Sequence, residues 1–199
     1  MAYDVALAKA LEEMKGISPY AAASKSGTDY DGSRFRIPFF DQVLLVYYPE
    51  VRVIEEGNSG PAQEWLKIIL LHYLLQANGA AVADEWIAYR QLPGGYIFER
   101  RFIQMTVNHL LRIFGDDIEA FKRAGVAIGG IPITRTGDAA FKFMALPRIP
   151  MACIFYLGEE GIPSSVNVLF DAAAHNYLPT EDLSLLGVAL VGAMKKARQ

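Results

Sequence analysis

The sequence predicts an α+β fold: a single domain in which an antiparallel or mixed sheet is flanked by helices. Its β-forming runs fall into two groups instead of alternating with helices, which is typical of antiparallel α+β domains. With 199 residues, of which 52% are hydrophobic and 21% charged, the chain can bury one core and is too apolar to be disordered. We therefore expect one domain over residues 1–199, with an N-terminal helix and strand meander in 1–60 and helices, strands and a C-terminal helix in 61–199.

The N-terminal part is expected to begin with an amphipathic helix. Apolar residues from Ala6 to Met14 recur at helical spacing, and Gly16 follows them as a helix stop. The next stretch, residues 24–33, contains Gly, Ser and Asp in a pattern that predicts turns. Runs of β-forming residues then predict a meander of strands at 35–40, 42–48 and 51–55.

The middle of the chain is predicted to be mainly helical. The clearest helix is expected at 62–77, and a second helical region at 99–114, followed by a short helix to Gly125. His72 and His109 lie on the apolar stripes of these two helices, so we expect both to be hydrogen-bonded histidines of the core. Between the two helices, residues 86–90 are predicted to be a short extended segment that leads into a Leu-Pro-Gly-Gly turn.

The last third of the chain returns to strands and closes with a helix. Apolar runs at 139–146, 151–157 and 164–170 are separated by proline and glycine turns. The final helix is predicted to begin near Thr180, whose hydroxyl can cap it, with Glu181 and Asp182 at its positive end. We expect the runs at 42–48 and 151–157 to be central strands.

Composition excludes several classes of function. A formal net charge of −3 with scattered Lys and Arg gives no basic surface typical of nucleic-acid binding. Cys153 is the one cysteine of the chain, so an internal disulfide and a four-thiolate metal or iron–sulfur site are excluded; it lies in an apolar run and is expected to be buried and unreactive. The absence of an export signal and of a long apolar stretch predicts a cytoplasmic protein without membrane contact.

The connector before the last helix carries the first candidate site. Asp171 and His175 are four residues apart, so in a helical turn the carboxylate would orient the imidazole as a general base or metal ligand requires. The alternative is that Asp171 caps a turn and His175 is exposed. The same connector holds Tyr177, Glu181 and Asp182.

A second candidate site lies at residues 86–95. Arg90 can hold a carboxylate or phosphate while Trp86 stacks on the ligand, and Gly94 and Gly95 would let the backbone approach it closely. The alternative is a tight turn that joins a strand to the next helix.

Two segments resemble an uncharacterised family, the domain of unknown function 3786, found mainly in anaerobic bacteria and archaea. The resemblance rests on W-I-A-Y-R-Q-L-P-G-G at 86–95 and L-F-D-A-A-A-H-N-Y-L-P-T-E-D-L at 169–183. It implies no activity. Because similar domains sometimes adjoin an iron–sulfur domain, it implies a redox or corrinoid-linked setting, reached here through a partner protein.

The function that these observations favour is a small-ligand or cofactor-binding accessory module. It would hold a small anionic ligand between the two segments, where polar turns meet apolar elements. The sequence identifies no cofactor, no metal site and no catalytic residue. Two alternatives stay open: an enzyme of unknown class that uses an Asp/His pair, and a protein–protein interaction module with an apolar surface. The candidate ligand-binding residues are Trp86, Arg90, Gly94, Gly95, Asp171, His175, Tyr177, Glu181 and Asp182.

Overall fold

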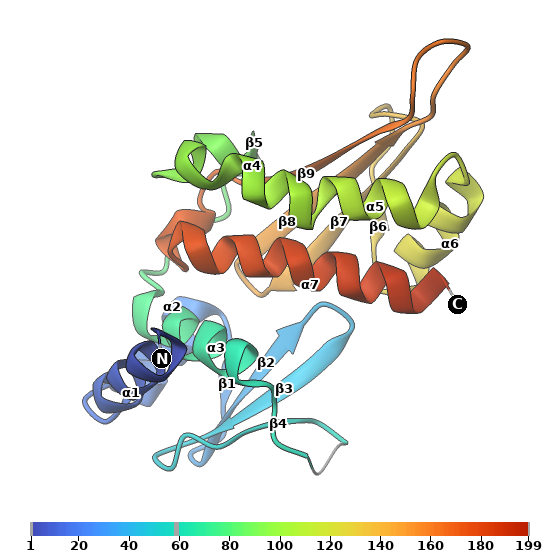
Figure 1. The fold of residues 1–199 in the computed structure, drawn as a ribbon. Coiled ribbons are helices and arrows are strands. Elements are labelled where there is room, and N and C mark those ends of the chain that lie inside the picture. The colour runs from blue at the N-terminus through green and yellow to red at the C-terminus, as the bar shows by residue number, and fades with distance from the viewer. Residues whose placement is uncertain (1, 58–59, 199) are drawn as a thin grey trace.

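The structure, a computed structural model, describes residues 2–57 and 60–198 and has the predicted α+β architecture (Figure 1). Its strands form two antiparallel sheets. Sheet A is a meander in the order β1-β2-β3-β4, made of β1 (Asp29–Tyr30), β2 (Arg34–Phe39), β3 (Gln42–Tyr47) and β4 (Val53–Glu55). Sheet B has the order β5-β9-β8-β7-β6 and comprises β5 (Trp86–Ala88), β6 (Ile131–Pro132), β7 (Ala139–Leu146), β8 (Ile149–Tyr156) and β9 (Ser165–Asp171).

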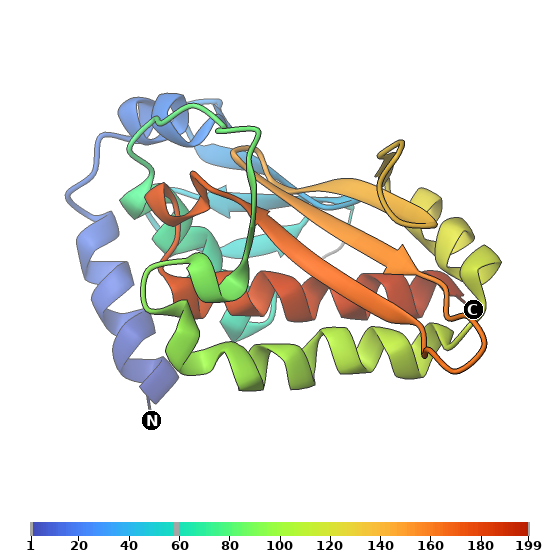
Figure 2. The same ribbon diagram turned by 90° about the horizontal axis from the view of Figure 1, so that it is seen from above.

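The helices gather on one side of sheet B and beside sheet A. They are α1 (Ala2–Met14), α2 (Pro19–Ser26), α3 (Glu64–Gln76), α4 (Gly95–Met105), α5 (Val107–Phe114), α6 (Ile118–Ala127) and α7 (Thr180–Arg198). Figure 2 shows α4, α5 and α7 along one face of sheet B. In Figure 1, α7 crosses the molecule with sheet B, α4 and α5 on one side and α3 with sheet A on the other. Helix α7 therefore packs against both parts of the chain.

The two predicted central strands are confirmed. Strand β3 lies between β2 and β4, and β8 lies between β7 and β9. Cys153 on β8 is fully buried, and burial raises the pKa of its thiol to about 12. Such a thiol carries almost no thiolate at neutral pH, as expected for a cysteine that serves as a small apolar side chain.

Helix α2 lies partly where the sequence predicted turns, in residues 24–33. Pro19 stands in its first turn, where a missing amide costs nothing. The Ser26 hydroxyl donates to the Ala22 carbonyl at 2.7 Å, and Gly27, with φ 70°, ends the helix. The turn prediction was wrong for residues 24–26, because serine is typical of turns, whereas here the Ser26 hydroxyl bonds back onto the helix.

The helical region predicted at 99–114 is divided into two helices. Helix α4 already begins at Gly95, and Thr106 separates it from α5 with φ −121° and ψ −79°. The Thr106 hydroxyl donates to the Phe102 carbonyl at 2.6 Å. A buried threonine that bonds the preceding turn in this way favours a bend.

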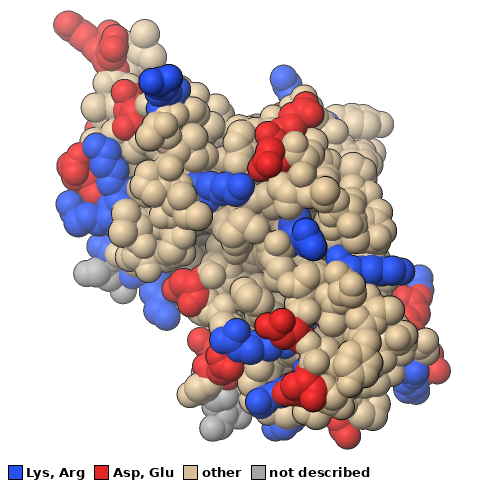
Figure 3. Space-filling view, turned by 180° about the vertical axis from the view of Figure 1, so that it is seen from behind, with Lys and Arg blue, Asp and Glu red and all other residues tan. Residues whose placement is uncertain are grey.

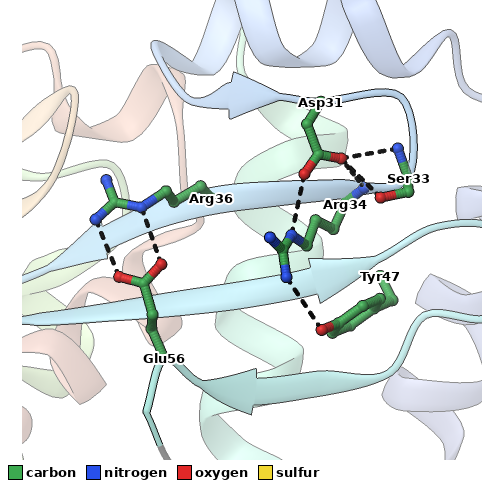
Figure 4. A network of polar contacts seen from close by, with 6 residues as sticks. All are labelled: Asp31, Ser33, Arg34, Arg36, Tyr47 and Glu56. Atoms are coloured by element: carbon green, nitrogen blue, oxygen red, sulfur yellow. Dashed lines mark hydrogen bonds and ion pairs between the residues drawn. The ribbon is translucent and has the colours of Figure 1, made fainter.

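The outer face of sheet A carries a polar network (Figure 4). Asp31 accepts hydrogen bonds from the hydroxyl and amide of Ser33 and from Arg34, and these bonds hold the pKa of its carboxyl well below its usual range. Arg36 forms a two-bond pair with Glu56, at 3.2 and 3.0 Å. These exposed groups are satisfied by one another, and their bonds link strands of the meander.

The surface on the other side of the molecule is mixed in charge. In Figure 3, Lys and Arg side chains alternate with Asp and Glu around broad uncharged areas. Within residues 2–57 and 60–198, none of the helices has the length and apolar character needed to cross a membrane.

Candidate functional site

The two segments singled out in the sequence meet in space. Strand β5 pairs with β9, so Trp86 lies opposite Asp171. The Thr180 hydroxyl donates to the Pro93 carbonyl at 2.7 Å, and the Tyr89 hydroxyl donates to the Thr180 carbonyl at 3.2 Å. Residues 86–95 and 171–182 therefore form one corner of the molecule.

This contact replaces the cap that was expected at the start of the last helix. Helix α7 begins at Thr180 as predicted, but the Thr180 hydroxyl is directed to Pro93 and the Leu183 amide donates to the Pro179 carbonyl at 3.0 Å. The predicted cap, a Thr180 hydroxyl that accepts from the first turn of the helix, was wrong. The turn at Pro93 lies against the start of α7, and its carbonyl accepts the hydrogen bond from the Thr180 hydroxyl.

Asp171 is the anchor of this corner. Its side chain is fully buried, and its two carboxylate oxygens accept the backbone amides of Ala83, Asp84 and Ala173 at 2.8–2.9 Å. His175 is exposed, and its Nδ1 lies 2.9 Å from the Ala172 carbonyl. Neither set of bonds joins Asp171 to His175. The structure therefore matches the alternative in which Asp171 organises a turn and His175 is exposed.

Tyr177 and Trp86 help to fix the same chain segment. Tyr177 is fully buried, its hydroxyl donates to the Ala80 carbonyl, and burial raises its pKa. The Trp86 ring has the Lys142 ammonium 5.9 Å from its centroid. The Tyr177 hydroxyl and the Trp86 ring, both expected at a ligand, thus interact with other residues of the protein.

The Pro-Gly-Gly turn approaches its own backbone. Gly95 is buried, and an added Cβ would overlap the Tyr89 carbonyl oxygen. Gly94 precedes α4 with φ 72°, a conformation that favours glycine. The Arg90 side chain is 65% exposed, and its Nε lies 4.0 Å from a Glu99 oxygen. Arg90 therefore has its acidic neighbour on α4 and not in the connector 171–182.

Glu181 and Asp182 belong to a different site, a cavity of about 460 Å³ between α3, α4 and α7. On one side, Asp182 Oδ2 lies 2.5 Å from Nδ1 of His72, a residue of α3. The Asp182 side chain is 10% exposed and that of His72 is 22% exposed. The chain thus contains a hydrogen-bonded Asp/His pair, but it is Asp182 with His72 and not the expected Asp171 with His175. We call this space the His72 cavity.

The second nitrogen of His72 is available to a ligand. Nδ1 is held by Asp182, and no described residue hydrogen-bonds Nε2. Every buried side-chain nitrogen in the described part of the chain has a hydrogen-bond partner. Since Nε2 has none, it is in contact with solvent, and the His72 side chain is 22% exposed. A carboxylate that fixes one imidazole nitrogen also fixes the direction of the other.

The remaining wall of the His72 cavity combines one cation with apolar side chains. Arg101 lines the cavity from α4 and has no acidic partner among the described residues. The apolar lining includes Phe98 and Phe102 from α4 and Leu185 and Val188 from α7. Phe102 stacks on Tyr89 with the ring centroids 4.2 Å apart, which fixes this wall.

The pKa of His72 is expected to lie above its ordinary value of 6.5, because Asp182 accepts its hydrogen bond; partial burial opposes the shift. Proton binding is then tighter in the folded protein. The pair contributes stability fully below pH 6.5 and loses that contribution as the pH rises through the raised pKa. Histidine ring NMR should show a titration midpoint above 6.5, and Asp182→Asn should bring it below 6.5, since the effect of burial remains.

A matched control for this titration is Glu181→Gln, which changes the neighbouring carboxylate without touching the His72 hydrogen bond. Its midpoint should stay close to that of the wild type. An unchanged His72 midpoint in Asp182→Asn would contradict the assignment of the pair.

Sequence reasoning missed His72 and Arg101 as site residues. His72 is hydrogen-bonded as expected, but it lines a cavity and is partly exposed. His109 was also expected in the core, whereas it is half-buried with Nδ1 2.8 Å from the Gln104 carbonyl. The available signal was a histidine on a mainly apolar face of α3, with no acidic residue within seven positions of it in the sequence.

Within residues 2–57 and 60–198, no group of three or more His, Cys, Asp or Glu side chains is placed to hold a metal ion.

Comparison with known proteins identifies the family. No curated protein and no solved structure gives a significant match. The family model described as Domain of unknown function (DUF3786) matches residues 18–193, which include both segments that carry the resemblance. The chain therefore belongs to the DUF3786 family.

Proposed function

We propose that the protein is a small-molecule-binding module that holds an anionic ligand in the His72 cavity. The observation that carries the proposal is the Asp182–His72 hydrogen bond at the wall of a cavity that is also lined by the exposed Arg101, which forms no ion pair with the described side chains. A carboxylate or phosphate would accept from the Arg101 guanidinium and from Nε2–H of His72. Guanidinium groups suit such anions because their donors match two oxygens at once.

The size and lining of the cavity support a ligand with an apolar part. A volume of about 460 Å³ lies in the range of small-molecule pockets. Phe98, Phe102 and Leu185 would cover the apolar part and exclude water from the ionic contact. The proposal keeps the ligand class expected from the sequence, a small anion. It places this ligand in the cavity beside Asp182 and not at the Arg90 turn.

Glu181 adds a negative charge to the His72 cavity. It lines the same cavity and is exposed, so it opposes an anion and would attract a cation. We expect Glu181→Gln to strengthen the binding of an anionic probe modestly. Weaker binding of the anionic probe in this variant would contradict an anion bound beside Glu181.

The test is calorimetric titration with benzoate and phenyl phosphate, using benzamide as the uncharged probe. Binding of both anions, and not of benzamide, is expected. Arg101→Gln should weaken anion binding by about tenfold or more, since a charged hydrogen bond contributes about 1.5–3 kcal/mol. The matched control is Arg100→Gln, which removes the adjacent arginine, a residue outside the cavity lining. Equal losses in the two variants would contradict the proposed site.

A second candidate function is general acid catalysis by His72. It is favoured by the same hydrogen bond, because Asp182 orients the ring and raises the pKa of His72 above its ordinary value, which favours the proton-donating form. Ser184 also lines the cavity, but its hydroxyl donates to the Glu181 carbonyl of its own helix, at 2.6 Å, and not to His72. The pair thus supports proton transfer to a bound ligand, without an activated serine.

A further inference from the structure

A second, larger cavity adjoins the His72 cavity along α7. It has a volume of about 850 Å³ and lies between α7, the start of α3 and the β2–β3 hairpin. Leu185 and Val188 line both cavities, so the two spaces are neighbours on the same helix. We call the second space the α7 groove.

One face of α7 runs through both spaces. Leu185, Val188 and Gly192 are three and four residues apart and therefore share a face. From Leu185 to Gly192 the helix rises about 10 Å. Ala189 and Ala193 are also part of the groove wall, and a Cβ added at Gly192 would meet nothing within 4 Å. Small side chains thus leave open space beside the helix, and Lys196 is the one charged residue that α7 contributes to the groove.

The opposite wall is rich in large apolar side chains. Phe39, Phe40 and Leu44 come from the hairpin, and Trp65 comes from the start of α3. The Trp65 indole Nε1 donates to the Gln63 side chain at 2.5 Å, so the polar edge of the ring is already satisfied. Asp41, Gln42, Glu55 and Gln63 also line the groove. Asp41 and Glu55 are acidic and Lys196 is basic, so these groove residues provide no excess of positive charge for a second anionic group.

We propose that the ligand is an amphipathic anion: a carboxylate or phosphate head at Arg101 and His72, and an unbranched apolar chain that passes Leu185 and Val188 into the α7 groove. This inference rests on the proposed function and adds the substrate class. The head contacts the Arg101 guanidinium and Nε2–H of His72, and the chain contacts Leu185 and Val188, which line both spaces. Each methylene that leaves water along this path adds to the affinity.

The test is a chain-length series of carboxylates, from butyrate through hexanoate and octanoate to decanoate, titrated below their micelle concentrations. Affinity should rise by about twofold to fourfold per added methylene, the upper value being that of full transfer out of water. Octyl phosphate should bind like octanoate, and octanol should bind at least about tenfold more weakly because it lacks the charged head.

Gly192→Leu separates the groove from the head site. The new side chain enters the open space at Gly192, on a helix where leucine is better tolerated than glycine. We expect decanoate binding to weaken by about tenfold while butyrate binding stays within about twofold, since the head site is unchanged. Gly192→Ala, which adds one carbon, should keep the chain-length gain.

The outcomes distinguish the two proposals. If butyrate and benzoate bind but longer chains bind no better, the amphipathic ligand is excluded and the anion site stands. If the chain-length gain is the same in Gly192→Leu, the chain does not occupy the α7 groove and this inference fails. If no anion of the series binds, both proposals fail.

Discussion

Replacing Asp171 with alanine is expected to lower the free energy of unfolding by about 4 kcal/mol, because three amides lose a charged acceptor at once. The carboxylate is fully buried and bonds the amides of Ala83, Asp84 and Ala173. Asp171→Asn should have an intermediate effect. One amide oxygen can still accept two of these bonds, while the new NH₂ group faces the third donor. Urea denaturation followed by circular dichroism measures both changes.

The matched control is Asp138→Ala. Asp138 is exposed and accepts a single side-chain hydrogen bond, from the Leu157 amide at 2.8 Å. Its loss should cost less than about 1 kcal/mol, since water replaces the carboxylate. If the two alanine variants are equally stable, Asp171 does not anchor the corner between 86–95 and 171–182.

The second large effect is expected from Gly95→Ala. The added methyl group would overlap the Tyr89 carbonyl oxygen, and the obstacle is backbone, which cannot rotate away. We expect a loss of about 3 kcal/mol, at the upper end of the range for overpacking. A thermal or urea unfolding curve checks this value.

Gly94→Ala is the control, one residue earlier in the same turn. A Cβ at Gly94 would meet nothing within 4 Å, so the cost is only that of alanine at φ 72°, about 1 kcal/mol. If both variants lose the same stability, backbone conformation and not the close approach explains why the turn contains two glycines.

The fold could be predicted from the sequence where local pattern decides it. The alternation of Phe35, Ile37 and Phe39 with Arg34 and Arg36 defines β2. The grouping of the strands predicts an antiparallel or mixed sheet, whereas the structure has two separate antiparallel sheets. The split at Thr106 depends on how one threonine hydroxyl bonds in a buried setting. Helix α2 depends in the same way on Ser26. Composition alone does not determine these choices.

The candidate site was only partly predictable for a physical reason. Asp182 was singled out, but its partner His72 is 110 residues away in the chain and reaches it through the packing of α3 against α7. A single sequence carries no signal for that packing angle. The expected Asp171–His175 pair is close in sequence, yet nearby backbone amides take up the Asp171 carboxylate. Local spacing therefore predicted an Asp/His pair at residues that do not pair with each other, while Asp182 pairs with the distant His72.

The central claim, an anion site at the His72–Asp182 pair, is tested most directly by histidine ring NMR during a titration with octanoate. The chain has three histidines, so each ring can be followed separately. The His72 ring signals should shift with saturation, those of His109 and His175 should stay in place, and Arg101→Gln should suppress the His72 shift. A His72 signal that stays unchanged at saturating octanoate, or a shift that is equal at all three rings, would contradict the claim.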